Sequence, residues 1–264
     1  MAGSEMTFWD HLDDLRRVLF RVVIVVMVLG IGAFAAMPWL FEHVIMAPCS
    51  PAFPTYRLFD PIIDSGAGNE FSIDVVSLEL ASQLFVHMSA ACWVALVVGF
   101  PIVIYLLWGF ISPGLYDHER RGATRAFLFG NVMFYLGVAI GYFMVFPIAL
   151  RFLSDYRLSD AIRPIVSLDS YMDNFFTILL MMGAVFELPL VAWLLGKMGL
   201  LSRSFFKKYR RHAIVALLIV AALITPTGDP FTLFLVFIPI YALWEGSARL
   251  VPPGSTEKND DPST

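Results

Sequence analysis

Long uninterrupted apolar runs constrain this chain more than any other feature of its sequence. Four runs reach the roughly 20 residues that an α-helix needs to cross a hydrocarbon core about 30 Å thick. They are residues 18–41, 80–110, 126–150 and 171–196. Because 58% of the residues are hydrophobic and 15% are charged, the composition is not that of a soluble domain. The pattern predicts an all-α, polytopic membrane protein.

A further apolar region, residues 213–250, is interrupted by the turn sequence TPTGDP at 225–230. Two short helices joined by a tight turn fit this region best. The first of them, 213–224, would be only about 18 Å long at 1.5 Å per residue, which is shorter than the hydrocarbon core. We therefore expect six transmembrane helices, the last two short, in a single domain over residues 1–250. Residues 251–264 are polar and are expected to form a disordered cytoplasmic tail.

The basic residues predict how such a bundle is oriented. Six spans place both termini on one side, and fourteen of the 18 Lys and Arg residues then fall on that side. The other four are Arg57, Arg151, Arg157 and Arg163. Because cytoplasmic loops of membrane proteins carry an excess of Lys and Arg, both termini are expected in the cytoplasm.

Glu187 is a carboxylate inside the otherwise apolar run 171–196, with no cation close to it in the sequence. A charge in the middle of a span costs about 2.5–3.5 kcal/mol even on insertion scales, so it must face protein, water or a partner. Pro189 follows two residues later and would open the backbone hydrogen bonds beside it. Glu187 is therefore either a functional group or a protonated side chain that hydrogen-bonds a neighbouring helix.

Soluble-enzyme signatures are absent from the sequence. There is no glycine-rich phosphate loop, no CxxC and no HExxH motif, and the five histidines are scattered. We expect no metal, no cofactor and no enzymatic activity. Nothing in the charge balance indicates a nucleic-acid partner.

Carboxylates precede arginine pairs at two places on the expected cytoplasmic side. These groups are Asp14 with Arg16 and Arg17, and Glu119 with Arg120 and Arg121. Carboxylates at a membrane surface can bind an incoming guanidinium through paired, charge-assisted hydrogen bonds. The alternative is that they neutralise the neighbouring arginines and cap helices.

Four motifs in the chain resemble those of one family. HLDDLRRVL (11–19), WGFISPGLYDHERR (108–121), FELP (186–189) and TPTGDPF (225–231) are similar to motifs of TatC, the multispanning receptor of the twin-arginine protein translocase. The matches occur in the family's order and extend from residue 11 to about 245. Of these motifs, the HERR loop is the specific one.

The resemblance implies roles for individual residues. Glu119, in the loop with Arg120 and Arg121, would contribute to binding the arginine pair of a signal peptide, and Phe110 would support that site. Asp14 and Arg16 would belong to the same binding region. Asp14 replaces the family's glutamate, and Val18 replaces its second motif arginine, so that Arg17 is the nearby charge.

Two further positions follow from the same resemblance. Glu187, followed by Pro189, is similar to the polar site where single-span partner subunits dock. Asp229 corresponds to an aspartate of the last external turn. An Asp followed by Pro230 also starts a helix by itself, as N-cap and first helical residue.

The resemblance implies a function as a whole. The chain would bind twin-arginine signal peptides of folded precursors and recruit single-span TatA/TatB-type subunits for export driven by the protonmotive force. It would self-associate in a receptor complex of the bacterial cytoplasmic (inner) membrane. The rival hypothesis is a proton- or ion-coupled secondary transporter that uses Glu187, although the internal repeat common among such transporters is not found.

Overall fold

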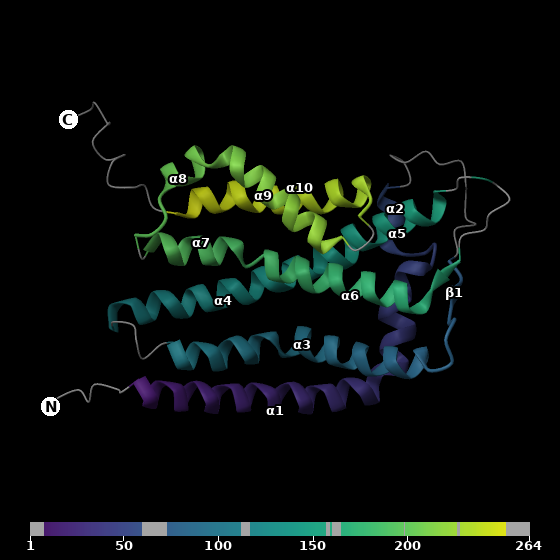
Figure 1. The fold of residues 1–264 in the computed structure, drawn as a ribbon, viewed down its shortest axis with the longest axis horizontal. Coiled ribbons are helices and arrows are strands. Elements are labelled where there is room, and N and C mark those ends of the chain that lie inside the picture. The colour runs from purple at the N-terminus through teal and green to yellow at the C-terminus, as the bar shows by residue number, and fades with distance from the viewer. Residues whose placement is uncertain are drawn as a thin grey trace.

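The computed structural model of the chain describes residues 8–59, 73–111, 117–156, 159, 165–197, 199–225 and 228–251, without the side chains of 8–11, 57–59, 111 and 117–126. These residues form a bundle of long helices that run along one common direction (Figure 1). In chain order the elements are α1 (Phe8–Leu40), η1 (Phe41–Ile45), η2 (Ala47–Cys49), α2 (Pro54–Phe59), β1 (Val75–Val76), α3 (Ser82–Ile111), α4 (Asp117–Ile140), η4 (Gly141–Val145), α5 (Phe146–Asp155), β2 (Val166–Ser167), α6 (Leu168–Val185), α7 (Leu188–Lys197), α8 (Arg203–Lys208), α9 (Arg210–Ile224) and α10 (Pro230–Leu250).

Five helical segments in the described part of the chain are long and apolar enough to cross a membrane. They are Leu12–Tyr56, Ser82–Phe110, Phe127–Asp155, Leu168–Lys197 and Pro230–Leu250. The four long apolar runs of the sequence therefore become helices, and α10, with 21 residues, is a fifth that was expected to be short.

The remaining one of the six expected spans, 213–224, is shorter than the other five. It is α9, which begins at Arg210 rather than at residue 213 and has 15 residues. Such a helix rises only about 22 Å, less than the hydrocarbon core. By length, therefore, five helices and not six qualify as spans among the described residues, because α9 already ends at Ile224.

The basic residues gather at one end of the bundle, which we call the basic end. Figure 1 shows that the start of α1, the end of α3, the start of α4 and the end of α10 all lie there, together with α8. The described side chains of this end include the following cations: Arg16, Arg17, Arg21, Lys197, Arg203, Lys207, Lys208, Arg210, Arg211 and Arg249. At the opposite end, which we call the loop end, lie α2, α5 and β1.

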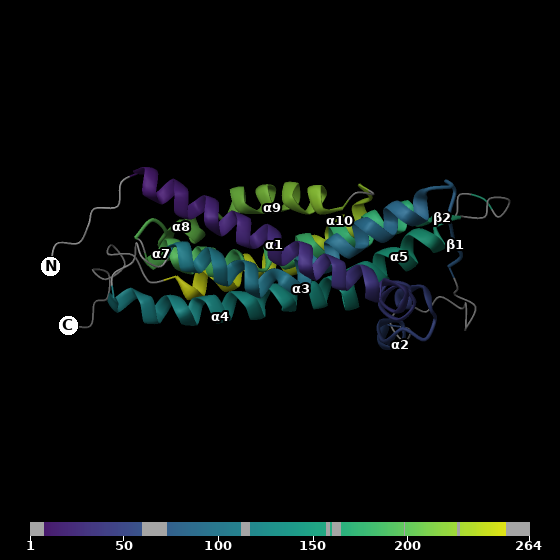
Figure 2. The same ribbon diagram turned by 90° about the horizontal axis from the view of Figure 1, so that it is seen from below.

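Neighbouring helices pack in pairs. α1 lies on α3, α4 on α6, and α10 on both α7 and α9, and Figure 2 shows α1 crossing α3. Gly137 and Gly183 lie at the contact of α4 with α6, where a Cβ on Gly183 would come within 2.7 Å of the Phe134 ring. Small residues let membrane helices approach closely, so these glycines set the spacing of this pair.

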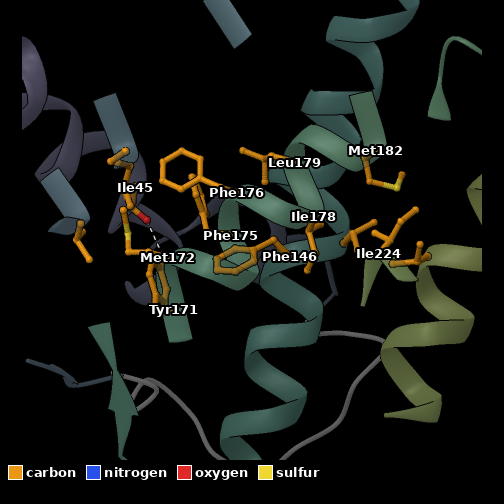
Figure 3. Close-up of a cluster of buried hydrophobic side chains, with 14 of the residues drawn as sticks. Ile45, Phe146, Tyr171, Met172, Phe175, Phe176, Ile178, Leu179, Met182 and Ile224 are labelled. Atoms are coloured by element: carbon orange, nitrogen blue, oxygen red, sulfur yellow. Dashed lines mark hydrogen bonds between the residues drawn. The ribbon is translucent and has the colours of Figure 1, made fainter. Parts of the chain in front are cut away.

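An aromatic cluster forms the core near the loop end (Figure 3). Phe146 contacts Phe175 edge to face, with ring centroids 5.0 Å apart, and Tyr171 in the same way at 5.3 Å. The hydroxyl of Tyr171 donates a hydrogen bond to the carbonyl of Ile45. This core therefore joins α5 and α6 to the turn that follows α1.

The loop end carries a strand pair, which the all-α prediction did not include, and an ordered segment that packs on the helices. β1 and β2 pair in parallel, with Val75 opposite Val166. The segment around α2 is tied to the bundle by Tyr56, whose hydroxyl donates to the carbonyls of Pro48 at 2.7 Å and Pro147 at 3.3 Å. The described residues 41–59, which follow α1, therefore cap this end of the helices.

Candidate functional site

Asp14 and its neighbouring arginines lie on the first turns of α1, at the basic end. The Asp14 carboxylate is 3.5 Å from Nη1 of Arg17, and their side chains are 47% and 70% exposed. Arg16 places its guanidinium 5.6 Å from the ring centroid of Phe20. Because exposed ion pairs stabilise by about 0–1 kcal/mol, the Asp14 carboxylate is accessible for an incoming cation. In the structure Arg17 is thus the cation paired with Asp14.

Phe110 and the HERR sequence lie on either side of the connection between α3 and α4. Phe110 is half-buried in the last turn of α3. Glu119, Arg120 and Arg121 lie in the first two turns of α4, and their side chains are outside the described residues. The ends of these two helices lie at the same end of the bundle as the start of α1 (Figure 1), which carries Asp14.

Glu187 lies in the break between α6 and α7. α6 ends at Val185 and α7 begins at Leu188, because Pro189 has no N–H to donate to Val185. The break that Pro189 predicted is confirmed. Glu187 is about ten residues from Lys197, which is roughly 15 Å along a helix and close to the middle of a 30 Å hydrocarbon core.

The carboxylate of Glu187 faces α4. Its Oε1 atom is buried without a hydrogen-bond partner among the described residues. A Cβ on Gly130 would lie 2.9 Å from Oε2 of Glu187 and 2.6 Å from Leu190, so the absence of a side chain at Gly130 makes room for the carboxylate. The hydrogen bond to a neighbouring helix that one interpretation of Glu187 required is not formed at Oε1.

A second polar group of the membrane interior lies next to Gly130. The Asn131 amide donates to the carbonyl of Phe127 at 2.9 Å, while its buried Oδ1 lacks a partner among the described residues. The sequence interpretation missed both Gly130 and Asn131. Asn131, an amide in the apolar run of residues 126–150, was the signal that could have indicated this position.

Asp229 is the N-cap of α10. Its Oδ1 accepts a hydrogen bond from the backbone N–H of Thr232 at 2.7 Å, and Pro230 occupies the first helical position. Both are features of a helix start. The capping interpretation of this aspartate therefore accounts for its geometry.

Asp229 offers a test that separates capping from another function of the carboxylate. Asp229→Ala should lower the stability of the protein by about 1 kcal/mol, since it removes the N-cap. Asp229→Asn should keep both stability and export, because asparagine caps equally well. Thermal unfolding in detergent and an export assay measure the two properties. Loss of export in a stable Asp229→Asn variant would show that the negative charge itself is needed.

Comparison with known proteins identifies the relatives of this chain. Residues 10–239 match the family model of the Sec-independent protein translocase protein (TatC). The chain belongs to the TatC family. It is 33% identical over 251 residues to a TatC protein of Blattabacterium sp. subsp. Periplaneta americana, covering 92% of this chain and 94% of that protein. It is also 33% identical to a TatC protein of Koribacter versatilis, covering 97% and 90%.

Solved structures of the same family have the same fold. A crystal structure titled as the twin-arginine translocase receptor TatC in DDM superposes with a TM-score of 0.74 and 27% identity, covering 91% of this chain and 99% of that one. A second structure of that receptor gives a TM-score of 0.71. The predicted family is therefore confirmed, and the chain is a multi-pass membrane protein of the twin-arginine translocase and not an enzyme.

Proposed function

We propose that the basic end of this TatC-family protein binds twin-arginine signal peptides, and that the break at Glu187 docks single-span TatA/TatB-type subunits for export driven by the protonmotive force. Six membrane crossings, with α9 as the short one, place both termini in the cytoplasm of a bacterial cell. The positive-inside rule supports this orientation, because the described cations lie mostly at the basic end.

The proposal of a signal-peptide site rests on the location of its residues. The start of α1, which bears Asp14, and the helix ends that bear Phe110 and Glu119 all lie at the basic end (Figure 1). Carboxylates accept the planar donor fork of arginine in pairs, which lysine cannot match. Asp14 is accessible beside Arg17, so a second carboxylate from the start of α4 would complete a site for two consecutive arginines.

Glu119→Gln should abolish crosslinking of a twin-arginine precursor, because glutamine keeps the size of the side chain and removes its charge. The protein should remain folded in the membrane. Asp117→Asn is the matched control, since it removes a charge from the same first turn of α4. Site-specific photocrosslinking in membranes, with normal and Lys-Lys signal peptides, measures binding. Equal losses in both variants would indicate a general effect of local charge rather than a role of Glu119.

The same assay tests Asp14. Asp14→Ala should weaken crosslinking less than Glu119→Gln, because the shorter aspartate reaches less far. Asp14→Glu restores the family's usual residue and should be tolerated. An inactive Asp14→Glu variant would contradict the correspondence between Asp14 and the motif acid.

A further inference from the structure

A small pocket at the basic end has no role in the function proposed above. It lies between α8 and the end of α10, beside the start of α9, and its volume is about 150 Å³. Four basic side chains from these three helices line it, namely Arg203, Lys207, Arg210 and Arg249. Arg203 and Lys207 are four residues apart on α8 and therefore lie on one face of that helix.

The pocket keeps a positive charge although an acid lines it. Glu245 is held by Arg210, with 2.7 Å between Nε and Oε1, and by the hydroxyl of Tyr241 at 2.9 Å. This pairing joins α9 to α10 and compensates the one carboxylate of the lining. Arg203, Lys207 and Arg249 are all exposed, so the lining has three more positive than negative groups.

Aromatic side chains form the apolar wall of the same pocket. Trp244 and Phe206 lie with their ring centroids 4.6 Å apart, and both line the pocket. On the neighbouring α7, the ammonium of Lys197 is 4.3 Å from the ring of Trp193. Tryptophan with basic residues at the end of apolar helices is typical of the membrane–water interface.

We propose that this pocket binds the phosphate of an anionic phospholipid, with Arg203, Lys207 and Arg249 around the phosphate and the glycerol end against Trp244 and Phe206. Basic pockets between transmembrane helices bind anionic lipid headgroups, because their cations attract the phosphate. The pocket lies at the end of α10, which is long enough to be a span and ends at Leu250. The end of a membrane-spanning helix lies at the level of the lipid headgroups. A bound lipid would hold α8, and with it the connection between α7 and α9, at the membrane surface.

The test compares lipid retention by the purified full-length protein in a neutral detergent. The pocket variant carries Arg203→Gln, Lys207→Gln and Arg249→Gln. The matched control carries Arg21→Gln, Lys208→Gln and Arg211→Gln, which removes three charges from the basic end outside the pocket. Native mass spectrometry counts bound phosphatidylglycerol and, separately, phosphatidylcholine. Thermal unfolding should be similar for all three proteins, because the substituted side chains of the pocket are exposed.

The pocket variant should lose phosphatidylglycerol by about tenfold or more, since each cation near a membrane surface contributes about 1 kcal/mol of attraction. The control should stay close to the unsubstituted protein, and phosphatidylcholine should not change. An equal loss in the control would overturn the proposal in favour of general surface charge. Displacement of the lipid by millimolar inorganic phosphate would assign the pocket to the free ion instead.

The acidic tail of the chain itself is the competing occupant. Its acids Glu257, Asp260 and Asp261 are neutralised together by Glu257→Gln, Asp260→Asn and Asp261→Asn in the full-length protein. Unchanged lipid retention supports a pocket that is open to lipid. A rise in lipid retention that depends on Arg203, Lys207 and Arg249 would show that the tail fills the pocket in the unsubstituted protein. That result would overturn the lipid as the occupant of the pocket.

Discussion

Glu187→Ala should lower the export of a twin-arginine precursor at least about tenfold while crosslinking of the precursor at the basic end stays largely intact. A hydrogen bond to a charged group is worth about 1.5–3 kcal/mol, which corresponds to one tenfold step or more. The carboxylate has one buried oxygen without a partner among the described residues. Such a group in the membrane interior is costly unless a partner satisfies it.

Glu187→Gln distinguishes docking from proton coupling. Glutamine can still donate and accept hydrogen bonds, so it should retain more export activity than alanine if the residue holds a partner helix. A coupling carboxylate must titrate, so in a proton-coupled transporter Gln would be as inactive as Ala. Copurification of single-span subunits with each variant, beside an export assay, measures both steps.

A neighbouring substitution controls for packing. Leu188→Ala removes a half-buried apolar side chain from the start of α7 and leaves the carboxylate in place. It should keep partner association closer to normal than Glu187→Ala does. If Ala and Gln at 187 are equally inactive while the partners remain bound to both, the docking model fails.

The sequence predicted the features that depend on local backbone chemistry. Pro189 lacks an N–H, so the break beside Glu187 followed from it directly. The sequence left two interpretations of Asp229 open, an N-cap and a functional aspartate. The hydrogen bond that Asp229 accepts from the N–H of Thr232 at 2.7 Å shows that it is an N-cap. The helix α1 begins at Phe8, before the apolar run 18–41 that predicted its span, because a helix continues past its apolar part while polar residues in water still favour it.

Features that depend on which helices become neighbours could not be predicted. The room that Gly130 leaves for Glu187 needs α4 to lie beside α7, and no periodicity in one segment specifies its partner. The pairing of Val75 with Val166 joins connections far apart in the sequence. The pocket around Arg203 and Arg249 likewise combines α8 with α10, whose contact arises only in the folded bundle.

Gly137→Ala should destabilise the protein by about 1–3 kcal/mol, the usual cost of overpacking a well-packed core. A Cβ at this position would lie 2.5 Å from the carbonyl oxygen of Met182 and 2.8 Å from the side chain of Phe186. The carbonyl belongs to the backbone of α6 and cannot turn away. The two helices must therefore separate, which removes the close contact that glycine permits.

Gly32→Ala is the matched control, because nothing lies within 4 Å of a Cβ at that position of α1. Alanine favours a helix over glycine by up to about 1 kcal/mol, so the control should be unchanged or slightly more stable. Thermal unfolding of the purified proteins in the same detergent compares them. Equal stability of the two variants would mean that α4 and α6 can move apart at little cost.

The Gly137 substitution also connects packing to function. Phe186 precedes Glu187 in the break between α6 and α7, so an added Cβ that pushes Phe186 also shifts the carboxylate. Gly137→Ala should therefore reduce partner association at temperatures where the protein is still folded, without altering precursor crosslinking at the basic end. Loss of both activities together would indicate general unfolding, whereas selective loss of partner association would show that helix spacing positions Glu187.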